Sequence, residues 1–351
     1  LNCGQIDMLL IHSYKRLAAS KPWTARFLLV SFILIILLAT IRGVMPFAIK
    51  TAAISWFESN HVKATIGEIE IDLFDGRFAI NDVVTSNATG KQLSLGRVAV
   101  IWQWKPLLDR KAIIPRVELG GLKVDAAFYE NGEKNIGGII IKPDADAKPQ
   151  AADQEAATPW DVNVQNIYIA DVEFCLQQYA ASKTPDTDHC VSLARFDWQG
   201  EIRLQQTRQA EVGEAVPLFI GGALNLSELA VQDNKLNLSL FKLGGLALTP
   251  LTIKTLEKIE LGEIALSHFS ALQRKDGSTA QDAQMVSFDS LSVKPVMLSQ
   301  LNDLKLGRIQ LNGAQAFYRI DKEGKTDLAY WFPAKPDTVP AKASEKGAPV
   351  S

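Results

Sequence analysis

The feature that most constrains this chain is an apolar run near its N-terminus, Phe27–Ile41. A helix over these residues rises only about 22 Å, which is shorter than a hydrocarbon core of about 30 Å. The helix reaches about 34 Å when it continues through Gly43–Ile49 and the Arg42 side chain extends to the interface. Trp23 and Trp56 flank the stretch, as interfacial tryptophans do. The sequence therefore predicts one helix that crosses a membrane.

Charge predicts how this helix is oriented. After Asp7 the preceding segment carries only basic charges: Lys15, Arg16, Lys21 and Arg26. Because positive residues stay on the cytoplasmic side, we expect a cytoplasmic basic tail over 1–22, a transmembrane and juxtamembrane helix over 23–58, and an exported body. A cleaved signal peptide is the alternative, but cleavage needs small residues at −3, where Leu37, Leu38 and Ile41 stand.

After residue 62, apolar and polar residues alternate with the period of β-strands. Ile69, Ile71 and Leu73 alternate with Glu68, Glu70 and Asp72, which gives one apolar face and one wet face. The alternation returns at Val98–Trp104, Val117–Leu119, Ile167–Ile169, Leu236–Leu240 and Ile309–Leu311. Turn signals such as Asp75-Gly76 and Gly120-Gly121 separate the runs. The exported part is predicted to be mainly antiparallel β, with short turns such as Pro106–Arg110.

Two stretches have compositions that cannot build a core. Residues 142–158 and 333–351 are rich in Ala, Pro and charged residues, which is typical of disordered linkers. They separate a first β unit over 59–141 from a second over 159–332. Since 333–351 resembles a linker, we expect this chain to be a fragment or short member of a longer architecture; a disordered tail is the alternative.

The strands also repeat. Val117–Val124 aligns without gaps with Ile309–Ala316, and Phe-Tyr follows each segment. Leu93–Val100 corresponds to Val286–Val293 upstream, and weaker copies begin at Ile167 and Ile264. Repeated strand pairs predict a modular sheet that grows by adding similar units.

Taken together, these segments resemble a known family. The basic tail and membrane helix are followed by a strand block ending at Val83, the strand Leu93–Val100, a Pro-Leu-Leu turn at Pro106–Leu108 and the pair around Val117–Val124. This order is similar to the N-terminal region of the AsmA-like superfamily, which includes AsmA, TamB and YhdP and large periplasmic proteins with a domain of unknown function. The resemblance is best over 62–140. It implies an elongated, repeat-built β-groove in the periplasm, anchored in the inner membrane, with a role in lipid transport and outer-membrane biogenesis.

A sheet with one apolar face must cover that face with another sheet, with itself or with lipid. The sequence leaves open a self-packed sandwich and a lipid-filled groove. Our candidates for the apolar, lipid-facing surface are Ile69, Ile71, Leu73, Phe78, Ile80, Leu93, Leu95, Val98, Val100, Val117 and Leu119. Membrane phospholipid is the expected partner of a groove. The alternative function is a non-catalytic structural or assembly factor that contacts other envelope proteins.

Other function classes have little support. The net charge of −2 gives no basic surface for nucleic acid, and 47% hydrophobic residues argue against general disorder. His12, His61, His189 and His268 are isolated in the sequence, without paired metal-ligand spacing. No Gly-x-Ser-x-Gly elbow occurs, and the glycine pairs lie in predicted β-turns. We therefore predict no enzyme, no metal and no cofactor.

Two cysteines lie in the exported part. Cys175 and Cys190 flank the polar segment Gln177–His189 between two predicted strands. A disulfide would close a loop of roughly 15 residues and stabilise the fold by about 3 kcal/mol in the loop-entropy account. Unpaired thiols on adjacent strands are the alternative.

Overall fold

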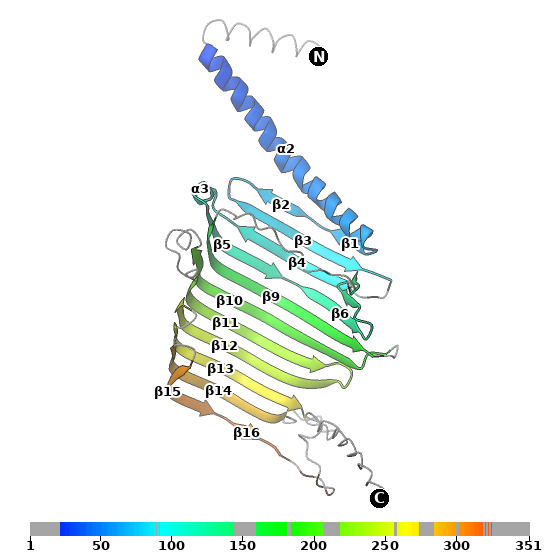
Figure 1. Cartoon of the computed structure of the whole chain (residues 1–351), viewed down its shortest axis with the longest axis vertical. Helices are drawn as coiled ribbons and strands as arrows, with labels where there is room; N and C mark the ends of the chain where they lie inside the picture. The colour runs from blue at the N-terminus through cyan, green and yellow to red at the C-terminus, as the bar shows by residue number, and fades with distance from the viewer. Residues whose placement is uncertain are drawn as a thin grey trace, which may run out of the picture.

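The computed structural model describes residues 22–88, 90, 92–143, 159–180, 184–205, 218–255, 258–273, 284–299, 302–318, 320, 322 and 324. In this part of the chain, one long helix stands at the end of a single-layered β-sheet (Figure 1). The predicted basic tail, the linker from residue 144 to 158 and the segment 333–351 lie outside the described residues.

Helix α2 runs over Pro22–Ser59 and contains Pro46. Its bounds differ by one residue at each end from the predicted span, so the helix is confirmed. Large apolar side chains cover its N-terminal two thirds and are exposed, among them Phe27 at 69% and Phe47 at 71%. The helix is long and apolar enough to cross a membrane, and its most apolar window is not buried against the protein.

The mainly β prediction is also confirmed. The strands before the undescribed segment at 144–158 are β1 (Lys63–Ile66), β2 (Ile69–Asp72), β3 (Arg77–Ser86), β4 (Gln92–Ile101), β5 (Lys111–Gly120), β6 (Lys123–Tyr129), β7 (Lys134–Ile136) and β8 (Ile139–Ile141). The strands after it are β9 (Asp161–Tyr179), β10 (Thr187–Gln205), β11 (Leu218–Asp233), β12 (Leu238–Thr255), β13 (Lys258–Gln273), β14 (Gln284–Ser299), β15 (Asp303–Asn312) and β16 (Gln315–Ala316). A short helix, α3 (Trp104–Leu107), separates β4 from β5.

All these strands belong to one sheet, and two parallel pairings, both made by β9, correct the antiparallel prediction. The path runs from β15 through β14, β13, β12, β11, β10 and β9 to β5 and β4. Strand β9 pairs in parallel with both β5 and β6, while the other pairs are antiparallel. A parallel pair needs a long crossover connection, and the chain between Ile141 and Asp161 is long enough to supply one. The sheet is therefore mixed, and β9 joins the two predicted β units edge to edge.

A small core lies where α2 meets the sheet. Ile66, Ile69 and Val83 are buried there, and Ile49, Ala53 and Ile54 of α2 pack against them. The Lys50 ammonium also donates a hydrogen bond to the Gly67 carbonyl at 2.8 Å. The C-terminal part of α2 thus covers the apolar side of the first strands.

One line of residues interrupts the strand alternation across almost the whole sheet. We call it the slip line; its members are Asp82, Gly96, Gly121, Asp171, Ala194, Glu228, Gly244, His268, Asp289 and Gly313. Six of them have positive φ: Asp82, Gly121, Asp171, Glu228, His268 and Gly313. Between β10 and β11, for example, Leu193 pairs with Leu229 and Arg195 with Ser227, so Ala194 and Glu228 are both skipped.

The slip line changes which residues share a face. Strict alternation would place Ile80 and Val83 on opposite faces, yet both pack in the core under α2 because Asp82 between them has φ 55°. A left-handed residue inserted in a strand re-aims the side chains that follow it. The apolar positions shift by one residue at the same line, from Ile169 to Val172 in β9. One face therefore stays apolar on both sides of the line.

Candidate functional site

The register of the strands aligns apolar side chains in two uninterrupted rows that cross the sheet. The first apolar row is Ile71, Phe78, Val100, Val117, Ile167, Trp198, Leu224, Leu248, Ile264, Val293 and Ile309. The second apolar row is Ile69, Ile80, Val98, Leu119, Ile169, Phe196, Leu226, Leu246, Leu266, Leu291 and Leu311. Each row takes one residue from every strand of β2–β5 and β9–β15, without a polar residue in either.

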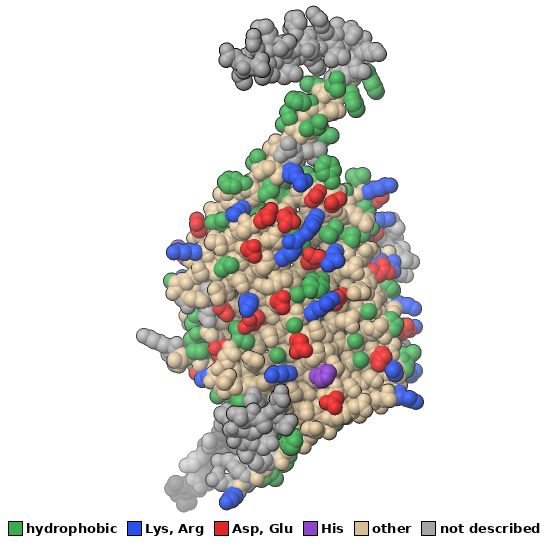
Figure 2. Space-filling view, turned by 180° about the vertical axis from the view of Figure 1, so that it is seen from behind, with side chains coloured by type: hydrophobic (Ala, Val, Ile, Leu, Met, Phe, Trp, Pro, Cys, Tyr) green, Lys and Arg blue, Asp and Glu red, His purple; other side chains and the backbone are tan. Residues whose placement is uncertain are grey.

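The row that lies between them in sequence points to the other face. Its members are Glu70, Ala79, Ala99, Glu118, Tyr168, Asp197, Asn225, Ala247, Ala265, Ser292 and Gln310. None is a large aliphatic residue. Charged side chains are spread over the face seen from behind in Figure 2. The sheet thus has one polar face and one apolar face, as its alternation requires.

The apolar rows are only half-buried. Trp198 and Ile69 are 3% and 7% exposed, but nearly all the other members are intermediate, and Ile309 and Leu311 at the β15 end are 56% and 52% exposed. Two packed sheets would bury such residues, as cores do. Among the described residues, the sheet has no second sheet against it, and its main contacts from outside are α2 with β1 and β2 and α3 with β5. The self-packed sandwich considered from the sequence is not present in this part of the chain.

Most of the predicted lipid-facing residues lie in these rows. Ile71, Phe78, Val100 and Val117 belong to the first row, and Ile69, Ile80, Val98 and Leu119 to the second. Leu93 and Leu95 lie beyond the slip line. Both pack against the core under α2, as do Ile71, Phe78 and Ile80, and Ile69 is part of that core, so six of the candidates lie where α2 covers the sheet. Whether these residues contact lipid stays a prediction.

Four apolar positions of the predicted alternation lie outside the strands: Leu73, Trp102, Trp104 and Leu236, the last in the turn between β11 and β12. Leu73 lies in the turn that follows β2, because the Asp72 carboxylate accepts hydrogen bonds from the Phe74 and Asp75 amides and ends the strand. Strand β4 ends at Ile101, so Trp102 and Trp104 lie beyond it and Trp104 begins α3. These residues are therefore not part of the apolar rows.

The sequence-based candidates missed the larger part of the rows, in β9–β15. A signal was present, since Leu224, Leu226, Leu246 and Leu248 alternate with small or polar residues. The register of the antiparallel pairs in this half carries the rows on to β15.

The polar face carries ion pairs, first among the strands nearest α2. Arg97 lies 3.6 Å from both Glu70 and Glu118, which come from strands on either side. Further along, Arg195 donates to Asp197 at 2.7 Å. This bond, together with a second from Gln199, lowers the pKa of Asp197 below its usual range, although partial burial opposes the shift. These contacts stabilise a wetted surface and position no reactive pair.

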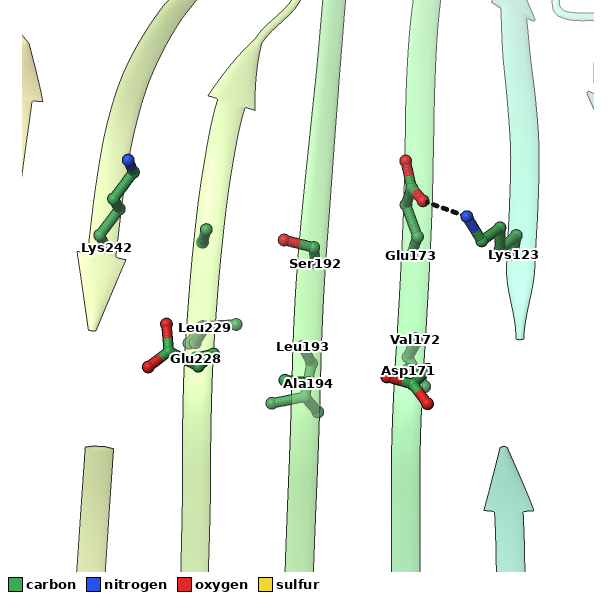
Figure 3. Close-up of a pocket in the computed structure, with 11 residues that line it drawn as sticks. Lys123, Asp171, Val172, Glu173, Ser192, Leu193, Ala194, Glu228, Leu229 and Lys242 are labelled. Carbon is green, nitrogen blue, oxygen red and sulfur yellow. Dashed lines mark ion pairs between the residues drawn. The ribbon is translucent and has the colours of Figure 1, made fainter. Parts of the chain in front are cut away.

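The polar face also carries an open cavity of about 390 Å³ beside the slip line. Lys123 and Glu173, 3.1 Å apart, line it with Asp171, Glu228 and Lys242 (Figure 3). Charges of both signs around an open hollow suit water rather than an acyl chain. Ser192 also lines the cavity, directly opposite Glu173 in the pairing of β10 with β9.

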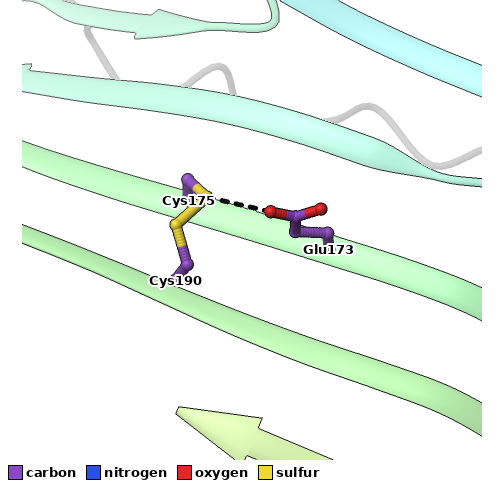
Figure 4. A group of neighbouring side chains, drawn as sticks. All are labelled: Glu173, Cys175 and Cys190. Carbon is purple, nitrogen blue, oxygen red and sulfur yellow. Dashed lines mark hydrogen bonds between the residues drawn. A yellow bond between two sulfur atoms is a disulfide. The ribbon is translucent and has the colours of Figure 1, made fainter. Parts of the chain in front are cut away.

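Cys175 and Cys190 are joined by a disulfide between directly opposed positions of β9 and β10, with their Cα atoms 4.1 Å apart. Glu173 approaches the Cys175 sulfur at 3.8 Å, so the three side chains lie close enough to suggest metal ligands (Figure 4). A metal binds thiolates, and both sulfurs are consumed by the disulfide. The cluster is therefore a cross-link on the polar face.

The histidines are not brought together. His61 follows α2, His189 lies 3.5 Å from Asp233, and His268 is exposed on the slip line. His12 lies outside the described residues.

Comparison of the chain with models of known protein families and with curated protein sequences gives no match. The AsmA-like resemblance therefore stays a prediction from the residues quoted for it.

Proposed function

We propose that this chain binds phospholipid acyl chains on the apolar face of its sheet and guides them away from the membrane that holds α2. The observation that carries the proposal is the pair of uninterrupted apolar rows from β2, beside α2, to β15. Such a surface fits the groove that the AsmA-like resemblance implies. Phospholipid from the inner membrane is then the ligand, and envelope maintenance is the process served.

Exposure favours lipid over a permanent protein cover. Because the rows are only half-buried, part of their apolar area is in contact with water. A ligand that covers this area gains a binding free energy of about 25 cal/mol per Å². A contiguous apolar patch of this extent on a soluble protein marks a binding surface. Acyl chains gain this energy without needing hydrogen bonds. Only Trp198 brings a polar atom into the rows, an indole N–H that is buried without a hydrogen-bond partner among the described residues.

The length of the rows favours movement over storage. At about 4.8 Å per strand, a row from β2 to β15 runs for roughly 50 Å. An acyl chain in one leaflet spans about 15 Å, half of a hydrocarbon core of about 30 Å. Each row is therefore long enough for several chains in line, which suits a path along which lipids advance.

The expected location agrees with this function. A single helix with a basic N-terminal flank favours a location of the sheet on the non-cytoplasmic side. The disulfide between Cys175 and Cys190 supports an oxidising compartment, because cytosolic thiols are kept reduced. The location we propose is the inner membrane, single-pass, with the body in the periplasm.

A second candidate is the structural or assembly factor, and β15 favours it. Among the residues that the structure describes, this strand ends the sheet path, and Leu304, Leu306, Ile309 and Leu311 on it are 49–57% exposed. An open edge strand is a template for pairing with another chain. In that case the sheet would tether a second envelope protein through β15.

The test is lipid content in matched variants of the full chain. Leu248 lies in the first apolar row, and its neighbour Ala247 lies on the polar face. We expect Leu248→Asp to reduce the phospholipid that copurifies in mild detergent several-fold, with little change in Tm, because a buried charge repels acyl chains. Ala247→Asp should retain the wild-type amount.

Mass spectrometry of the extracted lipid measures both variants. Equal lipid content in both would exclude the apolar face as the binding surface. Wild-type protein free of lipid, combined with capture of a strand at β15, would favour the tethering function instead.

A further inference from the structure

A second apolar feature lies outside the two rows, at a corner of the sheet. It is formed by the turn Leu73–Gly76 between β2 and β3 and by the segment Trp102–Arg110 around α3; we call it the α3 corner. Its three outermost large apolar side chains are strongly exposed, with Phe74 at 77%, Trp104 at 45% and Leu108 at 86%. Leaving apolar side chains of this size in water costs free energy. Three of them exposed together at one corner therefore indicate a surface that contacts an apolar partner.

Hydrogen bonds hold the two segments of the corner together. The Trp102 amide donates to the Gly76 carbonyl at 2.8 Å, and the Trp104 indole Nε1 donates to the Leu73 carbonyl at 2.5 Å. The rings of Trp102 and Trp104 also pack edge to face, 5.2 Å apart. The indole N–H of Trp104 is thereby satisfied inside the protein while part of its ring stays exposed. These contacts hold the two segments and the Trp104 ring in place, and Phe74 and Leu108 project from the same corner.

The corner lies at the end of the sheet from which α2 rises (Figure 1). It begins directly after β2, and β2 is one of the two strands that α2 contacts. A membrane crossed by the N-terminal part of α2 would therefore be the nearest large apolar phase to Phe74, Trp104 and Leu108.

The charges around the corner fit the surface of a bilayer. Lys105, Arg110 and Lys111 are exposed there, and the acids beside them are Asp72, Asp75 and Asp109. The charges of the corner therefore balance, which suits a zwitterionic lipid surface and does not require anionic lipid. Tryptophan and phenylalanine beside basic residues are typical of protein segments at the level of the lipid headgroups.

We propose that the α3 corner inserts Phe74, Trp104 and Leu108 into the headgroup region of the membrane that α2 crosses. The proposal rests on the membrane anchoring in the proposed function. With α2 as one contact and the α3 corner as a second, the β2 end of the sheet lies against the bilayer surface. The apolar rows then start at the level where acyl chains leave the membrane.

The test places nitroxide labels on the full chain in phosphatidylcholine nanodiscs, in a Cys3→Ser background. Labels go on Leu108→Cys in the corner, on Leu34→Cys in the exposed part of α2 and on Leu236→Cys in the turn between β11 and β12. The disulfide protects Cys175 and Cys190 from labelling. Leu236 is a matched control, since it is an exposed leucine in a turn many strands away from α2.

The ratio of collision with oxygen to collision with a water-soluble nickel chelate reports depth. We expect this ratio to be several-fold higher at position 108 than at 236, and highest at 34. If the ratio at position 108 equals that at 236 while position 34 lies in the hydrocarbon, the α3 corner does not insert, although α2 still crosses the membrane. If position 34 is exposed to water, α2 does not cross the membrane, and both the membrane anchoring and the insertion of the corner are contradicted. Phe74→Cys repeats the measurement from the other segment, so the outcome does not depend on one label.

Discussion

Gly200 and Gly222 face each other across β10 and β11 so closely that a Cβ on either residue would collide with the backbone of the opposite strand. We expect Gly222→Ala to destabilise the fold by about 2 kcal/mol, because the strands must separate locally to admit the methyl group. Thermal or denaturant unfolding measures the change. Gly120 is the control, since a Cβ there meets nothing within 4 Å. A larger loss of stability in Gly120→Ala than in Gly222→Ala would contradict this account.

The disulfide predicts a redox-dependent stability. Replacing Cys175 and Cys190 with serine should lower the free energy of unfolding by about 3 kcal/mol, the loop-entropy value for a closed loop of this size. Urea unfolding of wild type and variant with and without a reductant measures the difference. The reductant should destabilise wild type alone. A wild-type protein whose cysteines both react with a thiol reagent straight after gentle lysis would show that the bond does not form in the cell.

Asp197 predicts a specific acid sensitivity. Its pKa is lowered in the folded protein, mainly by the hydrogen bond from Arg195, so folding favours the ionised carboxylate. The stability that follows is present above the ordinary aspartate pKa of about 4 and is lost as the pH falls through the lower folded pKa. Asp197→Asn should therefore flatten the fall of Tm below about pH 4. An identical acid profile in wild type and variant would show that the bond contributes nothing to acid stability.

Orientation predicts the behaviour of reporter fusions. An alkaline phosphatase fused after Phe57 should be active, because the basic residues before the apolar run keep the N-terminus in the cytoplasm. A cytoplasmic reporter at the same point should be inactive. The opposite pair of results would reverse the topology.

The apolar rows predict two different responses to one substitution. Val100→Asp should remove bound lipid with a small change in Tm, since Val100 is half-buried with no covering layer among the described residues. Ile71→Asp should also lower Tm clearly, because Ile71 packs against the core under α2. Lipid mass spectrometry and thermal unfolding on both variants separate the two effects. Wild-type lipid content in Val100→Asp would remove that position from the binding surface.

The sequence alone predicted the helix, the strand class and much of the apolar face. Where a strand is regular, as around Ile69 and Ile71, the period-two alternation is enough to assign residues to the apolar face. The same assignment was wrong at Leu73, Trp102 and Trp104, because the Asp72 side chain ends β2 and β4 stops before the tryptophans.

The parallel pairing of β9 was not predictable from local patterns. Strand partners are chosen by tertiary packing, and the connection between β8 and β9 carries no pairing signal in its sequence. The slip line had a sequence signal that the alternation alone obscured, since Ile167, Ile169, Val172 and Phe174 change spacing at Asp171. Interpreting it required knowing that Asp171 has positive φ.

The slip line also limits which insertions and deletions the strands can accept. In each strand, the number of residues on either side of the slip position decides which face each side chain is on. Deleting one residue of β11 before or after Glu228 would therefore move its leucine side chains from the apolar face to the polar, water-exposed face. Losing two codons would keep the leucines on their own face and shift only their neighbours. Natural variants of this chain should therefore gain or lose strand residues in pairs, and accept single insertions in the connections between strands.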